Sequence, residues 1–130
     1  MSVDLKTYLP FFVQTTRKLV EEMDAQYKAL LRDKTDFKAL GELYRLSHSL
    51  MGQAHFMNFT ELSQTSHMMS QVFRALLDAK KSVEPETITD LNIVISAFRQ
   101  NLDNIERNLA QKDMKQSQEI LQKITTHFKT

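Results

Sequence analysis

Glycine and proline, the residues that most often interrupt helices, are almost absent from this chain. Two of each occur among 130 residues, against average frequencies of roughly 7% and 5% in proteins. Leucine, glutamine, methionine, lysine and glutamate, which favour helices, are abundant instead. A chain of this length is sufficient for one domain with one continuous core. We therefore expect a single all-α domain over residues 1–130.

Apolar residues recur three and four positions apart along most of the chain, the spacing that places them on one face of a helix. The pattern predicts four long amphipathic helices near residues 5–31, 37–54, 60–77 and 88–109, and a shorter one from about Asp113. Leu109 and Phe128 should lie on the buried faces of the last two. Four such faces cover one another with the shortest loops in an up-and-down four-helix bundle. We expect that bundle with an additional C-terminal flanking helix.

Local signals indicate where the expected helices begin. Pro10 lies inside the first apolar stripe, and since proline disrupts helix interiors, that helix should start near Leu9 or bend there. Thr35 or Asp36 would cap the second helix. Thr60 would cap the third, because threonine side chains can accept a hydrogen bond from the first turn of a helix.

The charges of the chain are balanced, since 17 basic residues stand against 16 acidic ones. A net charge of +1 gives no electrostatic reason to expect nucleic acid or an anionic membrane as a partner. The chain has no cysteine, no signal-peptide layout and no apolar run near the ~20 residues that span a bilayer. Neither spacing typical of a helical metal site occurs. We expect a cytoplasmic monomer without a metal or cofactor.

A histidine and a glycine are notable on the second expected helix. Tyr44, Ser47 and Met51 should point toward the core, which leaves His48 exposed beside the apolar stripe. Gly52 follows one turn later, although glycine inside a helix costs roughly 1 kcal/mol relative to alanine. The missing side chain at this position would let a bulky group reach the imidazole ring of His48.

Two segments at fixed separation resemble histidine phosphotransfer (HPt) domains. The segment His48–Ala54 reads His-Ser-Leu-Met-Gly-Gln-Ala, similar to the family motif His-x-(Leu/Ile)-Lys-Gly-x-Ala, and Arg45 completes an Arg-x-x-His pattern. Further along, Asn58–Leu62 resembles the family's Gly-Phe-Thr-x-Leu, and Ser66–Ser70 resembles its Thr-His-x-Met-Glu. The likeness extends from the first expected helix through Leu109. Among these domains, the chain resembles in particular the N-terminal phosphotransfer domain of the chemotaxis kinase CheA.

The resemblance implies a phosphocarrier. His48 would accept a phosphoryl group from a histidine kinase catalytic domain and pass it to an aspartate of a response-regulator receiver domain. Met51 stands where the family has a lysine that attracts the phosphoryl anion, and Ser70 stands where it has a glutamate that hydrogen-bonds the imidazole. Ser70 could still accept a hydrogen bond, and Arg45 could supply the positive charge. The expected supporting residues are Arg45, Met51, Gly52, His67 and Ser70.

The chemistry of histidine suits this role. Histidine side chains have a reference pKa of roughly 6.5, so a large fraction is neutral and nucleophilic at cytoplasmic pH. The phosphoramidate that such a ring forms is labile and passes its phosphoryl group on readily. Most of the catalysis would come from the partner, whose metal and lysine stabilise the moving charge. The chain has no ATP-binding signature, so we expect no kinase activity of its own.

These residues leave several alternatives open. Because Met51 and Ser70 replace two charged groups, the chain could be a degenerate HPt-like module that acts as an unphosphorylated adaptor or inhibitor of signalling proteins. A helical bundle with no signalling role is a third interpretation. His67 is either a supporting or structural residue or a second acceptor. Met51 and Met68 either fill the core or form an apolar docking surface. The chain is either a standalone carrier or an excised domain of a larger kinase.

Overall fold

Five α-helices account for most of residues 5–129, the part of the chain that the computed structural model describes. They are α1 (Leu5–Arg32), α2 (Phe37–Phe56), α3 (Thr60–Ala79), α4 (Pro85–Asn108) and α5 (Lys115–Lys129). Within residues 5–129 there is no strand, so the all-α prediction is confirmed. None of these five helices combines the length and the hydrophobicity that crossing a membrane requires.

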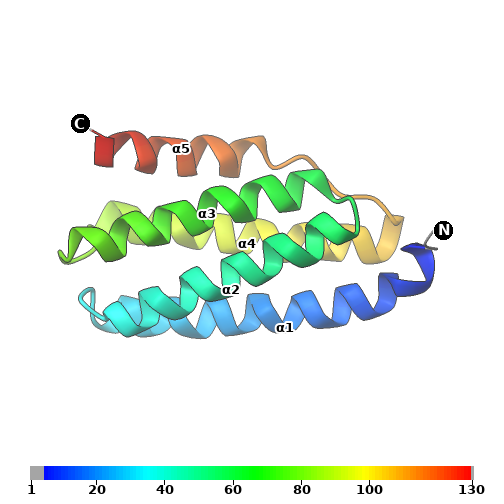
Figure 1. Cartoon of the computed structure of the whole chain (residues 1–130), viewed down its shortest axis with the longest axis horizontal. Coiled ribbons are helices and arrows are strands. Elements are labelled where there is room, and N and C mark those ends of the chain that lie inside the picture. The colour runs from blue at the N-terminus through cyan, green and yellow to red at the C-terminus, as the bar shows by residue number, and fades with distance from the viewer. Residues whose placement is uncertain (1–4, 130) are drawn as a thin grey trace.

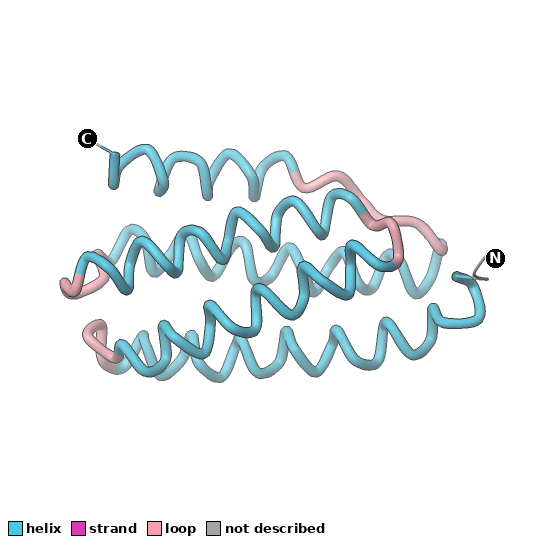
Figure 2. The backbone as a smooth tube through the Cα atoms, viewed as in Figure 1, coloured by secondary structure: helices cyan, strands magenta, loops and turns pink. Residues whose placement is uncertain are grey.

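The helices pack as a bundle around one core. Figures 1 and 2 show α1 to α4 running up and down beside one another, with α5 along the outside. α2 and α3 are the most closely packed pair, α1 contacts both α2 and α4, and α5 contacts α3 and α4. The predicted four-helix bundle with a flanking C-terminal helix is confirmed. The largest fully buried side chains are Met23, Leu30, Leu40, Leu43, Leu46, Leu50, Leu62, Met69, Phe73, Leu91, Ile95 and Phe98.

Pro10 lies inside α1, which begins five residues earlier at Leu5. Proline has no N–H to donate, and its ring collides with the carbonyl of the preceding turn, so a helix that continues through it bends. Figure 1 shows the first, blue part of α1 turning away from the axis of the remaining helix. Of the two predicted outcomes, a start near Leu9 and a bend, the structure has the bend.

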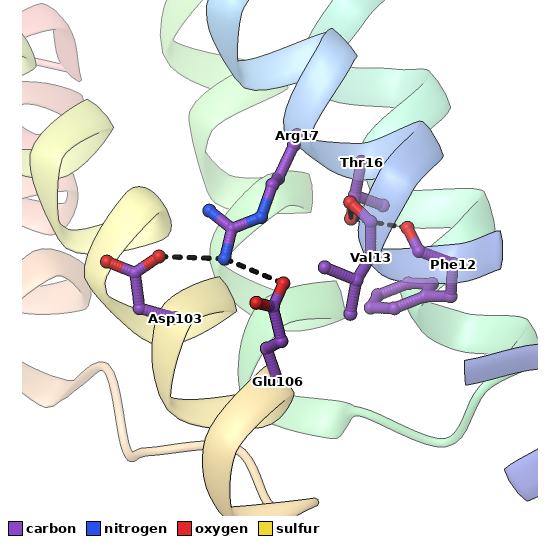
Figure 3. A network of polar contacts seen from close by, with 6 residues as sticks. All are labelled: Phe12, Val13, Thr16, Arg17, Asp103 and Glu106. Atoms are coloured by element: carbon purple, nitrogen blue, oxygen red, sulfur yellow. Dashed lines mark hydrogen bonds and ion pairs between the residues drawn. The ribbon is translucent and has the colours of Figure 1, made fainter. Parts of the chain in front are cut away.

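An arginine clamp joins α1 to α4 near the exposed edge of their interface (Figure 3). Nη2 of Arg17 lies 2.8 Å from Oδ1 of Asp103 and 3.1 Å from Oε2 of Glu106. Burial lowers the pKa of Arg17, but hydrogen bonds to the two carboxylates outweigh it and leave that pKa raised. Beside the clamp, the buried hydroxyl of Thr16 donates to the carbonyl of Phe12 at 2.6 Å, so no polar group is left unsatisfied there.

The cap of α2 agrees with the prediction, whereas the cap of α3 does not. Asp36 precedes α2 and accepts a hydrogen bond from the backbone N–H of Ala39 at 2.9 Å. Thr60, predicted to cap α3, is instead its first helical residue, and the residue before it makes no capping bond through its side chain. The prediction was wrong because the orphan N–H groups of α3 find their acceptor elsewhere in the chain.

That acceptor is Gln111, which lies in the connection between α4 and α5. Its Oε1 accepts hydrogen bonds from the backbone N–H groups of Glu61 at 3.0 Å and Leu62 at 3.4 Å. Its Nε2 donates to the hydroxyl of Thr60 at 3.3 Å. The carboxylate of Glu61 accepts in return from the backbone N–H of Met114 at 2.8 Å. The start of α3 and the start of α5 are therefore tied together in both directions.

Leu109 does not belong to the buried seam of α4, contrary to the prediction. It is the C-cap of that helix, with φ 59°, and its side chain is 59% exposed. The helix ends there because the following segment turns back over it, where Asn101 donates to the carbonyl of Lys112 at 3.0 Å and accepts from its N–H at 2.8 Å. A long-range contact therefore sets this end of α4.

Phe128 also departs from the prediction, since its side chain is 40% exposed. It lies at the end of α5, where it lines a pocket of about 260 Å³ with Leu76 and Val83. Its ring contacts the neighbouring ring of His127 edge-on, with 5.9 Å between the centroids. The buried face of α5 is made by residues earlier in the helix, including Leu121 and Ile124.

We predict that Gln111→Ala lowers the free energy of unfolding by about 1 kcal/mol, because two backbone N–H groups lose their acceptor. Thr60→Ala is the matched control and should cost much less, since it removes only the 3.3 Å bond to Gln111. Urea denaturation followed by circular dichroism measures both. A larger loss for Thr60→Ala than for Gln111→Ala would show that the threonine caps α3 in solution.

Candidate functional site

His48 projects from α2 into solvent. The neighbouring residues Leu46, Ser47 and Leu50 are at most 1% exposed, whereas His48 is exposed. The nearest aromatic ring is that of Tyr44, one turn earlier, with 6.2 Å between the centroids and 39° between the planes. Within residues 5–129 the imidazole makes no hydrogen bond or ion pair. The predicted accessibility of His48 is confirmed, and its ring nitrogens are available to a second molecule.

His67 occupies an exposed position on α3, the helix packed most closely against α2. Its imidazole likewise makes no hydrogen bond within the described part of the chain. The next residue, Met68, is partly buried against the core. Two exposed histidines therefore lie on adjacent helices, and the choice between a supporting role and a second acceptor stays open for His67.

Arg45 is held by a carboxylate on its own helix. Its Nη2 and Nε donate to the same oxygen of Glu42, Oε2, at 2.9 Å and 3.3 Å. The hydrogen bond from Arg45 lowers the pKa of Glu42, and the same bond raises the pKa of Arg45. The guanidinium is thus directed toward the preceding turn of α2, where Glu42 lies, rather than toward His48 in the following turn.

The two residues that depart from the family motif lie in different environments. Ser70 is 3% exposed, and its hydroxyl donates to the carbonyl of His67 at 2.6 Å. Within residues 5–129 it makes no hydrogen bond to His48. Met51 is partly exposed on α2 and brings no charge. Neither side chain compensates for the missing lysine and glutamate in this conformation, and the predicted acceptor role of Ser70 stays a prediction.

Gly52 is not required by packing or by backbone conformation. It is exposed, it has no positive φ, and a Cβ built on it would have no neighbour within 4 Å. Gly41, two turns before His48 on the same helix, has equally open surroundings. A helical glycine that nothing in the fold demands is consistent with the predicted role of Gly52 in clearing the approach to the imidazole.

An apolar groove borders Gly52 and was not predicted. It has a volume of about 480 Å³ and runs between the start of α1 and the end of α2. Tyr8, Phe11 and Phe56 on its rim are 47%, 67% and 57% exposed. The rings of Tyr8 and Phe56 meet edge-on with 6.2 Å between their centroids. All its lining residues are uncharged, namely Tyr8, Phe11, Phe12, Thr15, Gly52, Gln53, Phe56 and Met57.

The sequence did contain a signal for this groove. Phe11 and Phe56 fall outside the apolar stripes of their helices. When those stripes face the core, these two side chains point away from it. Apolar residues at such positions are exposed unless another molecule covers them.

Among residues 5–129 no group of three or more histidine, aspartate or glutamate side chains is placed to hold a metal ion.

Comparison with known proteins gives one family. The model of the Hpt domain matches residues 8–105. The chain is 27% identical over 105 residues to the chemotaxis protein CheA of Bacillus subtilis, a match that covers 80% of this chain and 14% of that protein. It is 28% identical over 109 residues to CheA of Salmonella typhimurium, covering 84% of this chain and 15% of that protein. The chain thus spans only a small part of the length of these relatives. No solved structure matches it.

Proposed function

The chain belongs to the Hpt domain family, and on this premise we propose that it accepts a phosphoryl group on His48 and passes it to an aspartate of a receiver domain. The observation that supports this most is the exposed imidazole of His48, which is free of hydrogen bonds within residues 5–129 and stands at the motif's histidine position. The donor would be a histidine kinase catalytic domain. A monomer in the cytoplasm is part of the same proposal.

The transfer needs one nucleophilic nitrogen. The unprotonated ring nitrogen of His48 attacks phosphorus with its lone pair, and the bond between phosphorus and the oxygen of the donor breaks. The other ring nitrogen carries the proton. In the second transfer a carboxylate oxygen of the receiver attacks phosphorus, and the electron pair of the P–N bond returns to the ring. Stabilisation of the moving charge comes mainly from the partner.

Docking of the partner is the other requirement. The aromatic groove formed by Tyr8, Phe11 and Phe56 lies beside Gly52, which is one turn from His48 on α2. A protein whose active site lies over His48 would extend over this uncharged surface. Burying its exposed aromatic rings would supply affinity without the desolvation of charges. Partly exposed Met51 and Met68 can adapt to the same partner.

A second function is favoured by one observation. Met51 has no charge, and the hydroxyl of Ser70 is engaged with its own helix at 2.6 Å. A module with these replacements could bind a signalling partner through the same face without accepting phosphoryl. The chain would then be an adaptor or inhibitor. This function predicts that the chain binds signalling proteins but receives no phosphoryl group from them.

Radioactive phosphoryl transfer separates the two functions. The chain is incubated with ATP and a CheA kinase catalytic domain, freed of kinase, and mixed with a receiver domain. The proposal expects an acid-labile, base-stable label on the chain that moves to the receiver, and no transfer to a receiver whose acceptor aspartate is replaced by asparagine. If the chain binds these proteins but is labelled by none of them, the adaptor function is correct.

We predict that Gly52→Ala slows phosphotransfer although it stabilises the fold. Alanine should raise the free energy of unfolding by about 1 kcal/mol, because the added Cβ meets nothing and helix propensity improves. The same Cβ narrows the approach to His48 and fills part of the groove. Urea denaturation and the rate of transfer from a kinase are measured together.

Gly41→Ala is the matched control for this prediction, since its Cβ also meets nothing. It should give the same gain in stability and leave the transfer rate unchanged. If Gly52→Ala unfolds the bundle, the glycine serves helix packing. If both variants transfer at the wild-type rate, Gly52 has no role in access.

We also predict that restoring the family's charges accelerates phosphorylation. Met51→Lys should raise the rate because a cation then lies one turn from the incoming phosphoryl group. Combining it with Ser70→Glu should raise the rate further, since a carboxylate can fix the imidazole tautomer. Position 70 is buried, so the single Met51→Lys variant provides the test if the double variant is unstable.

This prediction is tested by measuring how fast a kinase labels each variant, relative to the wild-type chain. A gain in the lysine variant means that a cation at position 51 adds to any charge that Arg45 supplies. No gain, together with efficient labelling of wild-type His48, means that another group already supplies the positive charge.

A further inference from the structure

Arg45 is the one residue with a fixed positive charge within a turn of His48 on α2. The residues three and four positions away from His48 are Tyr44, Arg45, Met51 and Gly52. On a helix surface such residues are neighbours. Side chains of a helix also lean toward its N-terminus, which brings the ring of His48 over the turn that contains Arg45.

The present partner of Arg45 holds it weakly. Both donated hydrogen bonds end on one oxygen of Glu42, so the two-pronged geometry in which arginine grips both oxygens of a carboxylate is not formed. The two side chains are 58% and 41% exposed. Water screens a pair of this kind, and exchange of the guanidinium to another anion therefore costs little.

From this arrangement we propose that Arg45 exchanges partners when His48 is phosphorylated, leaving Glu42 and binding the phosphoryl oxygens. The inference rests on the proposed function. Glu42 stands three residues before Arg45 and His48 three residues after it, so Arg45 lies between the two positions on one face of α2. Rotation of its side chain would carry the guanidinium from Glu42 to the phosphoryl group on His48. Glu42 is then the partner of Arg45 only while His48 is unphosphorylated.

The phosphoryl group is the stronger competitor for two reasons. It carries close to two negative charges against one on a carboxylate, and it presents three acceptor oxygens. The planar fork of arginine matches phosphoryl oxygens in pairs. Met51 offers no competing charge, so the exchange would fill the place that the family gives to a lysine.

Glu42 has the opposite effect on the same reaction. While it holds Arg45 it withdraws the cation from His48, and after the exchange it is an anion without its arginine partner, about two turns from the phosphoryl group. Glu22 also contributes to the field at Arg45, which is a further reason for the raised pKa of the arginine. Removing the cation and removing its carboxylate partner should therefore change phosphorylation in opposite directions.

The test uses phosphoramidate as donor, because this small molecule brings no protein groups to the site. Its P–N bond breaks, ammonia leaves, and the phosphoryl group is transferred to the ring nitrogen. The initial rate for Arg45→Gln should fall roughly fivefold, the effect of one charge pair near 4 Å in water. The rate for Glu42→Gln should rise about twofold, because the residue is farther away. Met51→Lys added to Arg45→Gln should restore most of the rate.

A second ion pair provides the control for charge alone. Arg74 and Asp78 form an exposed pair on α3, 3.4 Å apart. Arg74→Gln and Asp78→Asn change the net charge as the test variants do and should leave the rate unchanged.

In the wild-type chain the nuclear magnetic resonance signal of the Arg45 Nε–H group should shift on phosphorylation.

Each outcome has a definite meaning. A wild-type chain that takes no phosphoryl group from phosphoramidate or from any kinase overturns the proposed function and this inference with it. A wild-type chain labelled no faster than Arg45→Gln overturns the inference alone. Equal slowing and equal loss of stability in Arg45→Gln and Glu42→Gln would show a purely structural ion pair, which also overturns it. An Nε–H signal that does not move on phosphorylation does the same.

Discussion

The direction of His48 depends on the burial of the opposite face of α2. Leu43, Leu46, Ser47 and Leu50 are each at most 1% exposed, so α2 cannot rotate about its axis without withdrawing all of them from a close-packed core. The small residue Ser47 lies on this face and donates to the carbonyl of Leu43 at 2.8 Å, which satisfies its hydroxyl inside the bundle. An imidazole presented by a rigid helix needs no ordering when a partner arrives, which would lower the entropic cost of the proposed reaction at His48.

The second face of the site, on α3, depends on a segment beyond the family match. The Hpt model ends at residue 105, yet Gln111 satisfies the first N–H groups of α3, and Glu61 holds the backbone of Met114. The hydroxyl of Thr65 on α3 accepts from Gln118 of α5 at 3.1 Å. The fifth helix is thus integrated with the helix that positions His67 and Ser70.

Local signals predicted the elements, and long-range contacts decided the details that were missed. Helical periodicity identified all five helices, and the cap at Asp36 could be predicted because its acceptor lies three residues from the donor. The cap of α3 could not, because Gln111 is 50 residues away from Glu61. The exposure of His48 followed from its place beside the stripe. The ion pair of Arg45 and Glu42 could have been predicted, because residues three positions apart on a helix are neighbours. The groove could not, because it forms only when α1 and α2 bring together aromatic residues that lie outside their apolar stripes.

Locating the phosphoryl group tests the central claim most directly. The chain is labelled with phosphoramidate, kept at alkaline pH to preserve the P–N bond, and analysed by peptide mass spectrometry beside His48→Gln and His67→Gln. Transfer through His48 predicts label on the α2 peptide, its complete loss in His48→Gln, and its retention in His67→Gln. Label that persists in His48→Gln and disappears in His67→Gln would contradict the claim and place the acceptor on α3.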